Sequence, residues 1–165
     1  MITIILILFV LYFFLFLASI YLKDNGIADV FWGFGFMVIA GFSFLFYSDE
    51  NMAQITLTFL IFLWGSRLSF HIGMKNLQHV HEDARYAAWR KEWKNVYLRS
   101  FFQVYMLQGF FMCVIATPIF LINLHSGFDS NIFLSLLGLV VALFGIFYET
   151  KADGELAQFM KHKKK

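Results

Sequence analysis

Hydrophobic residues along the chain gather in five long runs, and short polar segments separate these runs. A helix needs roughly 20 apolar residues to cross a hydrocarbon core of about 30 Å, and each run comes close to that length. The pattern therefore predicts an all-α integral membrane helical bundle, organised as a single membrane domain over residues 1–165. The five predicted transmembrane helices cover residues 2–22, 27–47, 52–74, 97–122 and 132–148.

Composition agrees with a lipid-embedded protein and excludes an ordinary soluble domain. The chain is 60% hydrophobic, 21% aromatic and 15% charged, whereas soluble domains are about half apolar and about a quarter charged. The lone cysteine, Cys113, excludes a disulfide framework and a zinc site built on cysteine.

Lysine and arginine are distributed unevenly between the two sides of the predicted bundle. The loops at residues 48–51 and 123–131 contain neither, so all 13 basic residues fall on the other side. Because cytoplasmic loops carry the excess of lysine and arginine, we expect the N-terminus outside and the C-terminus in the cytoplasm. Residues 149–165 then form a basic cytoplasmic tail. This topology accounts for the basic residues, so membrane lipid is an expected partner and nucleic acid is not.

The predicted cytoplasmic loop, residues 75–96, contains an amphipathic stretch. Tyr86, Trp89 and Trp93 recur at helical spacing among basic residues, which predicts a helix lying at the level of the lipid headgroups. The nearby His79, His81 and Asp83 have irregular spacing, and we expect no metal site there.

Polar residues inside membrane helices usually face a bundle interior or a wet cavity. Several such residues gather near the cytoplasmic ends of the predicted helices, together with tryptophans on the same helix faces. They predict a substrate pocket that opens toward the cytoplasm. The candidates are Asp29, Trp32, Trp64, Arg67, His71 and Gln108.

Structural roles for the same residues stay open. Asp29 can cap its helix or pair with Arg67, Arg67 can reach lipid phosphates, and Gln108 can bond between helices. The glycines of "WGFGF" and its surroundings, Gly33 among them, predict close helix approach rather than a dinucleotide-binding loop, because they lie inside an apolar helix.

Five segments occur in an order and spacing that resemble the steroid 5-alpha-reductase family, and in particular its bacterial branch of multi-pass membrane proteins. They are "KDNGIADVFWGFGF", "LWGSRLSFHIG", "HEDARYAAWR", "MLQGFF" and "YETKADGELAQF". The resemblance implies a membrane oxidoreductase, here in the bacterial inner membrane. Such enzymes use NADPH to reduce a carbon–carbon double bond conjugated to a ketone.

The resemblance also implies roles for single residues. Glu149 and Asp153 match two cofactor-contacting positions after the fifth helix, although glutamate replaces asparagine at the first. Gln108 and Arg67 match residues of the fourth and third helices. Trp64 stands where the steroid reductases have the tyrosine that polarises the substrate ketone. We therefore expect an enone-like lipid or isoprenoid substrate rather than a steroid, and no catalytic residue is assigned.

Members of that family continue beyond the position of Lys165 with further helices that complete the NADPH pocket. The resemblance thus implies the N-terminal portion of a reductase, inactive alone or completed by a second chain that supplies those helices. Two alternatives stay open. One is a non-enzymatic lipid-binding or assembly subunit of the membrane. The other is a lipid or isoprenoid methyltransferase that uses S-adenosylmethionine.

Overall fold

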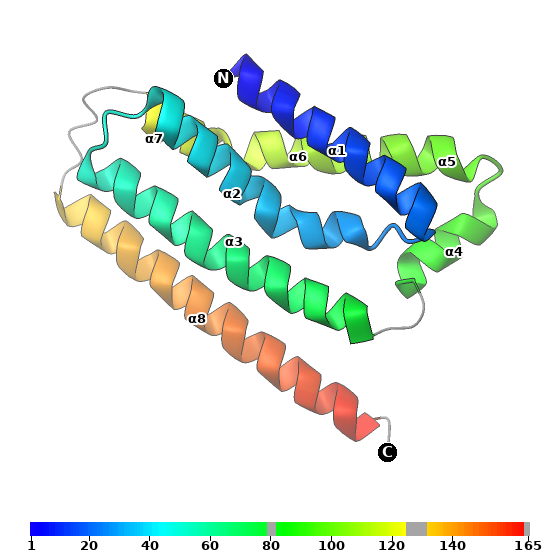
Figure 1. Ribbon diagram of the computed structural model, residues 1–165. Coiled ribbons are helices and arrows are strands. Elements are labelled where there is room, and N and C mark those ends of the chain that lie inside the picture. The colour runs from blue at the N-terminus through cyan, green and yellow to red at the C-terminus, as the bar shows by residue number, and fades with distance from the viewer. Residues whose placement is uncertain (79–81, 125–131, 164–165) are drawn as a thin grey trace. The chain divides into compact units, whose positions relative to one another are not determined.

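The computed structural model describes residues 1–78, 82–124 and 132–163, and within these ranges the chain is helical with no strand. Its contacts divide into two compact units, Met1–Ser126 and Gly127–Lys165, which are treated separately below. Figure 1 labels the helices. Their bounds are α1 Ile2–Leu22, α2 Ile27–Tyr47, α3 Met52–Gln78, α4 Ala84–Glu92, α5 Val96–Arg99, η1 Ser100–Met106, α6 Leu107–Ile115, α7 Thr117–Leu124 and α8 Ile132–Lys163.

The predicted all-α membrane bundle is confirmed. Among the described residues, five helical stretches are long and apolar enough to cross a membrane. They are Ile2–Leu22, Ile27–Tyr47, Met52–Leu77, Val96–Ile115 and Ile132–Met160. The chain is thus a multi-pass membrane protein, and its sidedness stays a prediction.

Two predicted boundaries were wrong because the helices continue. α3 runs on to Gln78, and α8 continues beyond residue 148 to Lys163, so most of the predicted tail is helix. The residues after Tyr148 are good helix formers such as alanine, leucine, glutamate and lysine. Lys151 and Glu155 also form an i,i+4 ion pair at 3.9 Å on this stretch, which adds a small stabilisation.

The predicted fourth helix, residues 97–122, is broken. It contains the π-helix η1 near its start, α6 ends at Ile115, and α7 begins a new helix at Thr117. Pro118 explains the break, because its ring would clash with the carbonyl of Val114 in a continuous helix. The side-chain hydroxyl of Thr117 bonds that carbonyl instead, at 2.7 Å.

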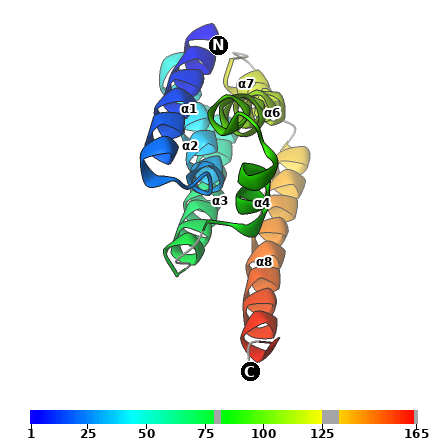
Figure 2. The ribbon, with the colours of Figure 1, turned by 90° about the vertical axis from the view of Figure 1, so that its right-hand side faces the viewer.

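Helix α2 is the centre of the first unit and packs against α1, α3, α6 and α7. Figures 1 and 2 show α1 running alongside α2. The α2–α3 crossing depends on two glycines, since a Cβ added to Gly65 would lie 2.7 Å from the carbonyl oxygen of Gly33. The predicted close approach at Gly33 is confirmed. The core beside it includes fully buried Tyr12, Ile39 and Met112.

A small polar cluster joins the end of α2 and the start of α3 to the end of α7. Gln54 is fully buried and accepts hydrogen bonds from the backbone N–H groups of Asp49 and Asn51, at 3.0 and 3.2 Å. Its amide group donates to the carbonyl of Ile122 at 3.0 Å. Asn123 donates to the hydroxyl of Ser43 at 2.8 Å. These bonds close the α2–α3 turn onto α7.

Candidate functional site: a polar cluster around Asp29

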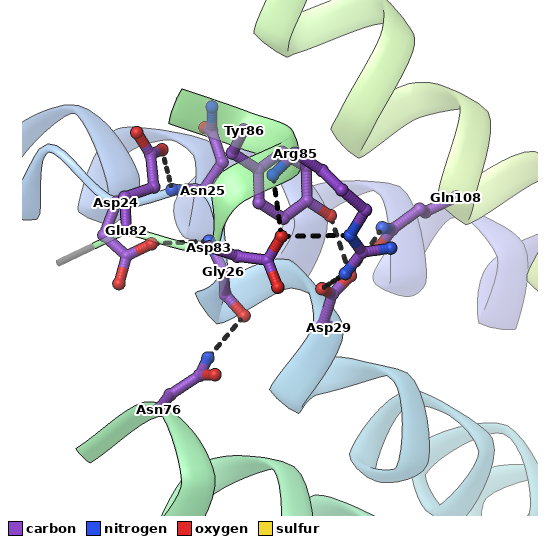
Figure 3. Close-up of polar contacts among 10 residues, drawn as sticks. All are labelled: Asp24, Asn25, Gly26, Asp29, Asn76, Glu82, Asp83, Arg85, Tyr86 and Gln108. Atoms are coloured by element: carbon purple, nitrogen blue, oxygen red, sulfur yellow. Dashed lines mark hydrogen bonds and ion pairs between the residues drawn. The ribbon is translucent and has the colours of Figure 1, made fainter. Parts of the chain in front are cut away.

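The turn between α1 and α2 forms one wall of a second, larger polar region at the other end of α2 (Figure 3). Lys23 ends α1 in the left-handed conformation, with φ 54°. Asp24 then accepts a hydrogen bond from the N–H of Gly26 at 2.7 Å. Asn25 is only 2% exposed and donates its amide to the hydroxyl of Ser100 at 3.1 Å. This short turn therefore ties the start of α2 to η1.

The carboxylate of Asp29, in the first turn of α2, collects three side-chain donors from two other helices. Tyr86 Oη donates at 2.7 Å, Arg85 Nη2 at 3.0 Å and Gln108 Nε2 at 3.3 Å. Arg85 and Tyr86 belong to α4, and Gln108 belongs to α6. We call these four residues the Asp29 cluster; Figure 3 shows all four converging. The Asp29 side chain is 24% exposed, so solvent only partly screens these bonds.

Two carboxylate residues just before α4, Glu82 and Asp83, hold this helix in place next to the Asp29 cluster. Asp83 caps the helix, accepting from the N–H of Arg85 at 2.9 Å and from its Nε at 3.0 Å. Glu82 holds the guanidinium of Arg90 with two bonds, of 2.8 and 2.9 Å. The same carboxylate accepts from the N–H of Asn25 at 2.9 Å. Bidentate arginine–carboxylate pairs combine strength with fixed geometry, so Glu82 locks α4 to the α1–α2 turn.

The end of α3 closes the region from another side. The amide of Asn76 donates to the carbonyl of Gly26 at 3.0 Å. That carbonyl also accepts from the N–H of Asp29 at 3.1 Å. Segments from α1, α2, α3, α4, η1 and α6 thus meet at one end of the first unit.

Burial and charge set the protonation of the groups on α4. Burial, and then the negative charge of Asp29, raise the pKa of Tyr86 well above its ordinary value of 10. The Tyr86 phenol therefore stays protonated and acts as a hydrogen-bond donor. The hydrogen bond from the Arg85 side chain lowers the pKa of Asp83, and the same bond raises the pKa of Arg85. This pair stays ionised at neutral pH.

Gln108 has one atom that the cluster does not use. Its Oε1 is buried and accepts no hydrogen bond from the residues that the structure describes. Buried unpaired acceptors are rare in folded proteins, and each needs an explanation. Gln108 also lies two residues after the end of the π-helix η1, and π-helical turns are frequent at functional sites. The Oε1 atom is thus open to a donor from a ligand or water.

The structure brings together some of the residues that the sequence predicted for a substrate pocket. Asp29 and Gln108 bond directly. Trp32 and Trp64 both pack edge-on against the ring of Phe36, with ring centroids 5.7 and 5.6 Å from it. Asp29 forms its ion pair with Arg85 of α4; Arg67 had been considered as that partner.

The other predicted residues are placed as follows. Arg67 and His71 are half-buried, one turn apart on α3. Glu149 and Asp153 are half-buried, one turn apart on α8, which belongs to the second unit. His79 and His81 lie outside the described residues. Among the described residues, no group of three or more histidine, cysteine, aspartate or glutamate side chains could hold a metal ion.

The amphipathic helix differs from its prediction. α4 ends at Glu92, before Trp93. Tyr86 is only 3% exposed, because its hydroxyl reaches Asp29. Trp89 is 40% exposed and stacks on Trp93 with centroids 5.5 Å apart. The predicted interface helix is therefore in part a wall of the site, and its tyrosine faces the protein.

Sequence reasoning missed Glu82, Arg85 and Tyr86 as site residues. They lie in "HEDARYAAWR", a segment that was singled out, but its aromatic and basic residues were assigned to lipid. Asn25 was missed as well, although it lies in "KDNG" at the start of another such segment.

Comparison with known proteins gives a single kind of match. A family described as "Protein of unknown function (DUF1295)" matches residues 15–165. No curated protein and no solved structure matches the chain significantly.

Proposed function

The chain belongs to this DUF1295 family of membrane proteins of unknown function, and from the Asp29 cluster we propose that it forms the membrane part of an NADPH-dependent reductase. The reductase would be of the steroid 5-alpha-reductase type, and its substrate an enone-like lipid or isoprenoid. One observation carries the proposal. Three of the five segments on which the resemblance rests supply the residues of the cluster. These residues are distant in sequence, since Tyr86 lies 57 residues and Gln108 lies 79 residues after Asp29.

The cluster contains the kind of group that such a reaction needs. Reduction of a double bond conjugated to a ketone adds a hydride to the β carbon and a proton to the α carbon. A donor must hold the ketone oxygen while negative charge develops on it. Trp64, at the position of the tyrosine in the steroid reductases, has no ionisable proton. Tyr86 supplies a phenol elsewhere in the same unit, hydrogen-bonded to an acid at 2.7 Å.

We assign to Tyr86 the role of the donor to the substrate ketone. When its hydroxyl turns from Asp29 to a substrate, the carboxylate keeps Arg85 and Gln108 as donors. The raised pKa of Tyr86 keeps the proton on the phenol at neutral pH. The unused Oε1 of Gln108 can accept a hydrogen bond from the same substrate or from an ordered water.

NADPH is proposed by resemblance, and it would supply the hydride. The carboxylates of Glu149 and Asp153 lie one turn apart on α8 and are both half-buried. Carboxylates accept hydrogen bonds from ribose hydroxyls and from a carboxamide, so these two residues fit the uncharged part of the dinucleotide. They do not fit its phosphates, which need cations.

Activity is tested in native membranes, where any second chain that completes the protein is present, by following NADPH oxidation with a series of enone lipids. We expect Tyr86→Phe to lower kcat by about 100-fold or more per folded molecule, as for loss of one hydrogen-bond donor to a developing oxyanion. Tyr21→Phe is the matched control, since Tyr21 is 87% exposed on α1. Equal turnover by the two variants would remove Tyr86 from the reaction.

Cofactor binding is tested separately, by the quenching or enhancement of NADPH fluorescence. Asp153→Ala should weaken binding, whereas Glu155→Ala, two residues further along the same helix, should leave it unchanged. Unaltered NADPH affinity in Asp153→Ala would remove this residue from the cofactor site.

A second candidate is a non-enzymatic lipid-binding or assembly subunit. One observation favours it: the carboxylate of Asp29 is already satisfied by three donors within the chain. In that case the cluster only holds helices together. Membranes would then bind no NADPH, and Tyr86→Phe would change stability alone.

A further inference from the structure

A shallow groove of about 410 Å³ lies between α1 and the α5–η1 segment, apart from the Asp29 cluster. Its lining consists of Phe13, Phe16, Asn95, Tyr97, Leu98 and Phe101. The Phe101 ring contacts both α1 residues of the lining, with centroids 5.1 Å from Phe16 and 6.4 Å from Phe13. The walls are therefore apolar, and only Asn95 and the Tyr97 hydroxyl bring polar atoms to the groove.

The groove lies where a membrane-spanning segment begins. The fourth span starts at Val96, directly after Asn95, whose side chain caps α5 by accepting from the N–H of Leu98 at 3.2 Å. Tyr97 and Leu98 are 61% and 55% exposed. A tyrosine at the end of a spanning helix is typical of the headgroup level. The groove thus extends from the headgroup level into the hydrocarbon region.

Two cations adjoin residues of the groove in the sequence, Lys94 directly before Asn95 and Arg99 directly after Leu98. Lys94 and Arg99 are exposed, and the structure gives neither of them an ion pair with another described residue. Exposed Glu92 lies two residues before Lys94, and the sequence from Trp93 to Phe128 contains no further aspartate or glutamate. An apolar groove next to two cations that form no ion pair with a described residue matches a molecule with an acyl chain and an anionic head.

We infer that this groove binds one anionic phospholipid, with an acyl chain along Phe13, Phe16, Leu98 and Phe101. Its phosphate would lie at Lys94 and Arg99, within reach of the Asn95 amide. A volume of about 410 Å³ falls within the roughly 300–1,000 Å³ typical of ligand sites. The inference does not depend on the proposed reductase activity.

Lipid retention is the test. The protein is purified in detergent, stripped of lipid and incubated with either phosphatidylglycerol or phosphatidylcholine. Bound lipid is counted by native mass spectrometry. We expect phosphatidylglycerol to bind more tightly than phosphatidylcholine.

Lys94→Gln and Arg99→Gln should each weaken the binding of phosphatidylglycerol by about fivefold, since a cation near anionic lipid contributes about 1 kcal/mol. The binding of phosphatidylcholine should stay unchanged in both variants. Lys75→Gln, at exposed Lys75 on α3, is the charge control and should have no effect.

The acyl-chain part needs its own variant. Leu98→Trp fills the groove and should lower the retention of both lipids, whereas Val114→Trp, at a 52% exposed position of the same span, should not. Equal retention of the two lipids by the unaltered protein, or an equal effect of Lys75→Gln, would overturn the inference. The unfolding temperature of Leu98→Trp is measured alongside, and unchanged lipid retention in the folded variant would overturn the acyl-chain assignment.

Discussion

At the scale of single residues, Tyr86 has the largest consequence for the first unit. It lies on a nine-residue helix, yet it is only 3% exposed. Its phenol bonds a carboxylate on α2, 57 residues earlier in the chain. A hydrogen bond to a charged group contributes about 1.5–3 kcal/mol to stability, more than one between neutral groups. This hydroxyl is therefore one of the bonds that attach α4 to the rest of the first unit, beside the ion pairs of Arg85 and Arg90.

We expect Tyr86→Phe to lower the free energy of unfolding by about 1.5–3 kcal/mol, because the ring volume is kept and only the bond to Asp29 is lost. Thermal unfolding in detergent, compared with Tyr21→Phe, measures this loss. Equal transition temperatures for the two variants would show that the bond to Asp29 contributes nothing.

At the scale of elements, Asp83 makes the stability of α4 dependent on pH. The hydrogen bond from Arg85 lowers the pKa of Asp83 below its ordinary value of 3.8. A lowered folded-state pKa contributes stability above the unfolded pKa, and this contribution is lost as the pH falls through the folded pKa. The loss is therefore confined to acidic solution, below about pH 4.

Two variants separate the charge of Asp83 from its role as a cap. Asp83→Ala should lower stability by about 0.5–2 kcal/mol at pH 7, as for loss of an N-cap. Asp83→Asn keeps the capping oxygen and should lose less at pH 7. Unfolding measured from pH 7 to pH 3 should fall less steeply for Asp83→Asn than for the unaltered protein. Parallel curves would contradict the assignment.

The α2–α3 crossing provides a matched pair of glycines on one helix. A Cβ at Gly65 would lie 2.7 Å from a backbone oxygen, whereas a Cβ at Gly73 would lie 3.6 Å from the nearest atom, Val30 Cγ1. Gly65→Ala should therefore separate the helices and cost about 1–3 kcal/mol. Gly73→Ala should be neutral or stabilising, because alanine favours a helix over glycine. Denaturation in detergent decides the order, and the reverse order would contradict it.

At the scale of the whole molecule, the sidedness of the membrane protein is the main prediction still to be tested. We expect the loop with Glu50 outside and the segment with Lys94 in the cytoplasm. In a Cys113→Ser background, a membrane-impermeant thiol reagent should label Glu50→Cys in intact cells. It should label Lys94→Cys only after the membrane is opened. The opposite labelling would reverse the topology.

Apolar periodicity could predict the five spans, because crossing a bilayer imposes a length and a composition that a single sequence displays. It could not predict the break before Pro118 or the π-helix, which depend on local competition for backbone carbonyls. The sequence also allowed Asp29 and Gln108 to be predicted as site candidates, since polar residues are rare inside apolar membrane helices. Arg85 and Tyr86 were assigned to lipid because a contact with a residue 56 or 57 positions away leaves no local pattern.

The buried Gln54 has a consequence for the order of events during synthesis. Its amide partner, the carbonyl of Ile122, lies 68 residues further along the chain. At roughly 5–20 residues per second, the ribosome needs about 3–14 s to add that distance. Because α3 ends at Gln78, the first three helices are complete for the later part of this interval while the Gln54 amide still lacks its partner on α7. The bond between the α2–α3 turn and α7 can therefore form only after residue 122 has been added. A pause in translation before this residue would lengthen the time for which the nascent α2–α3 hairpin lacks that bond.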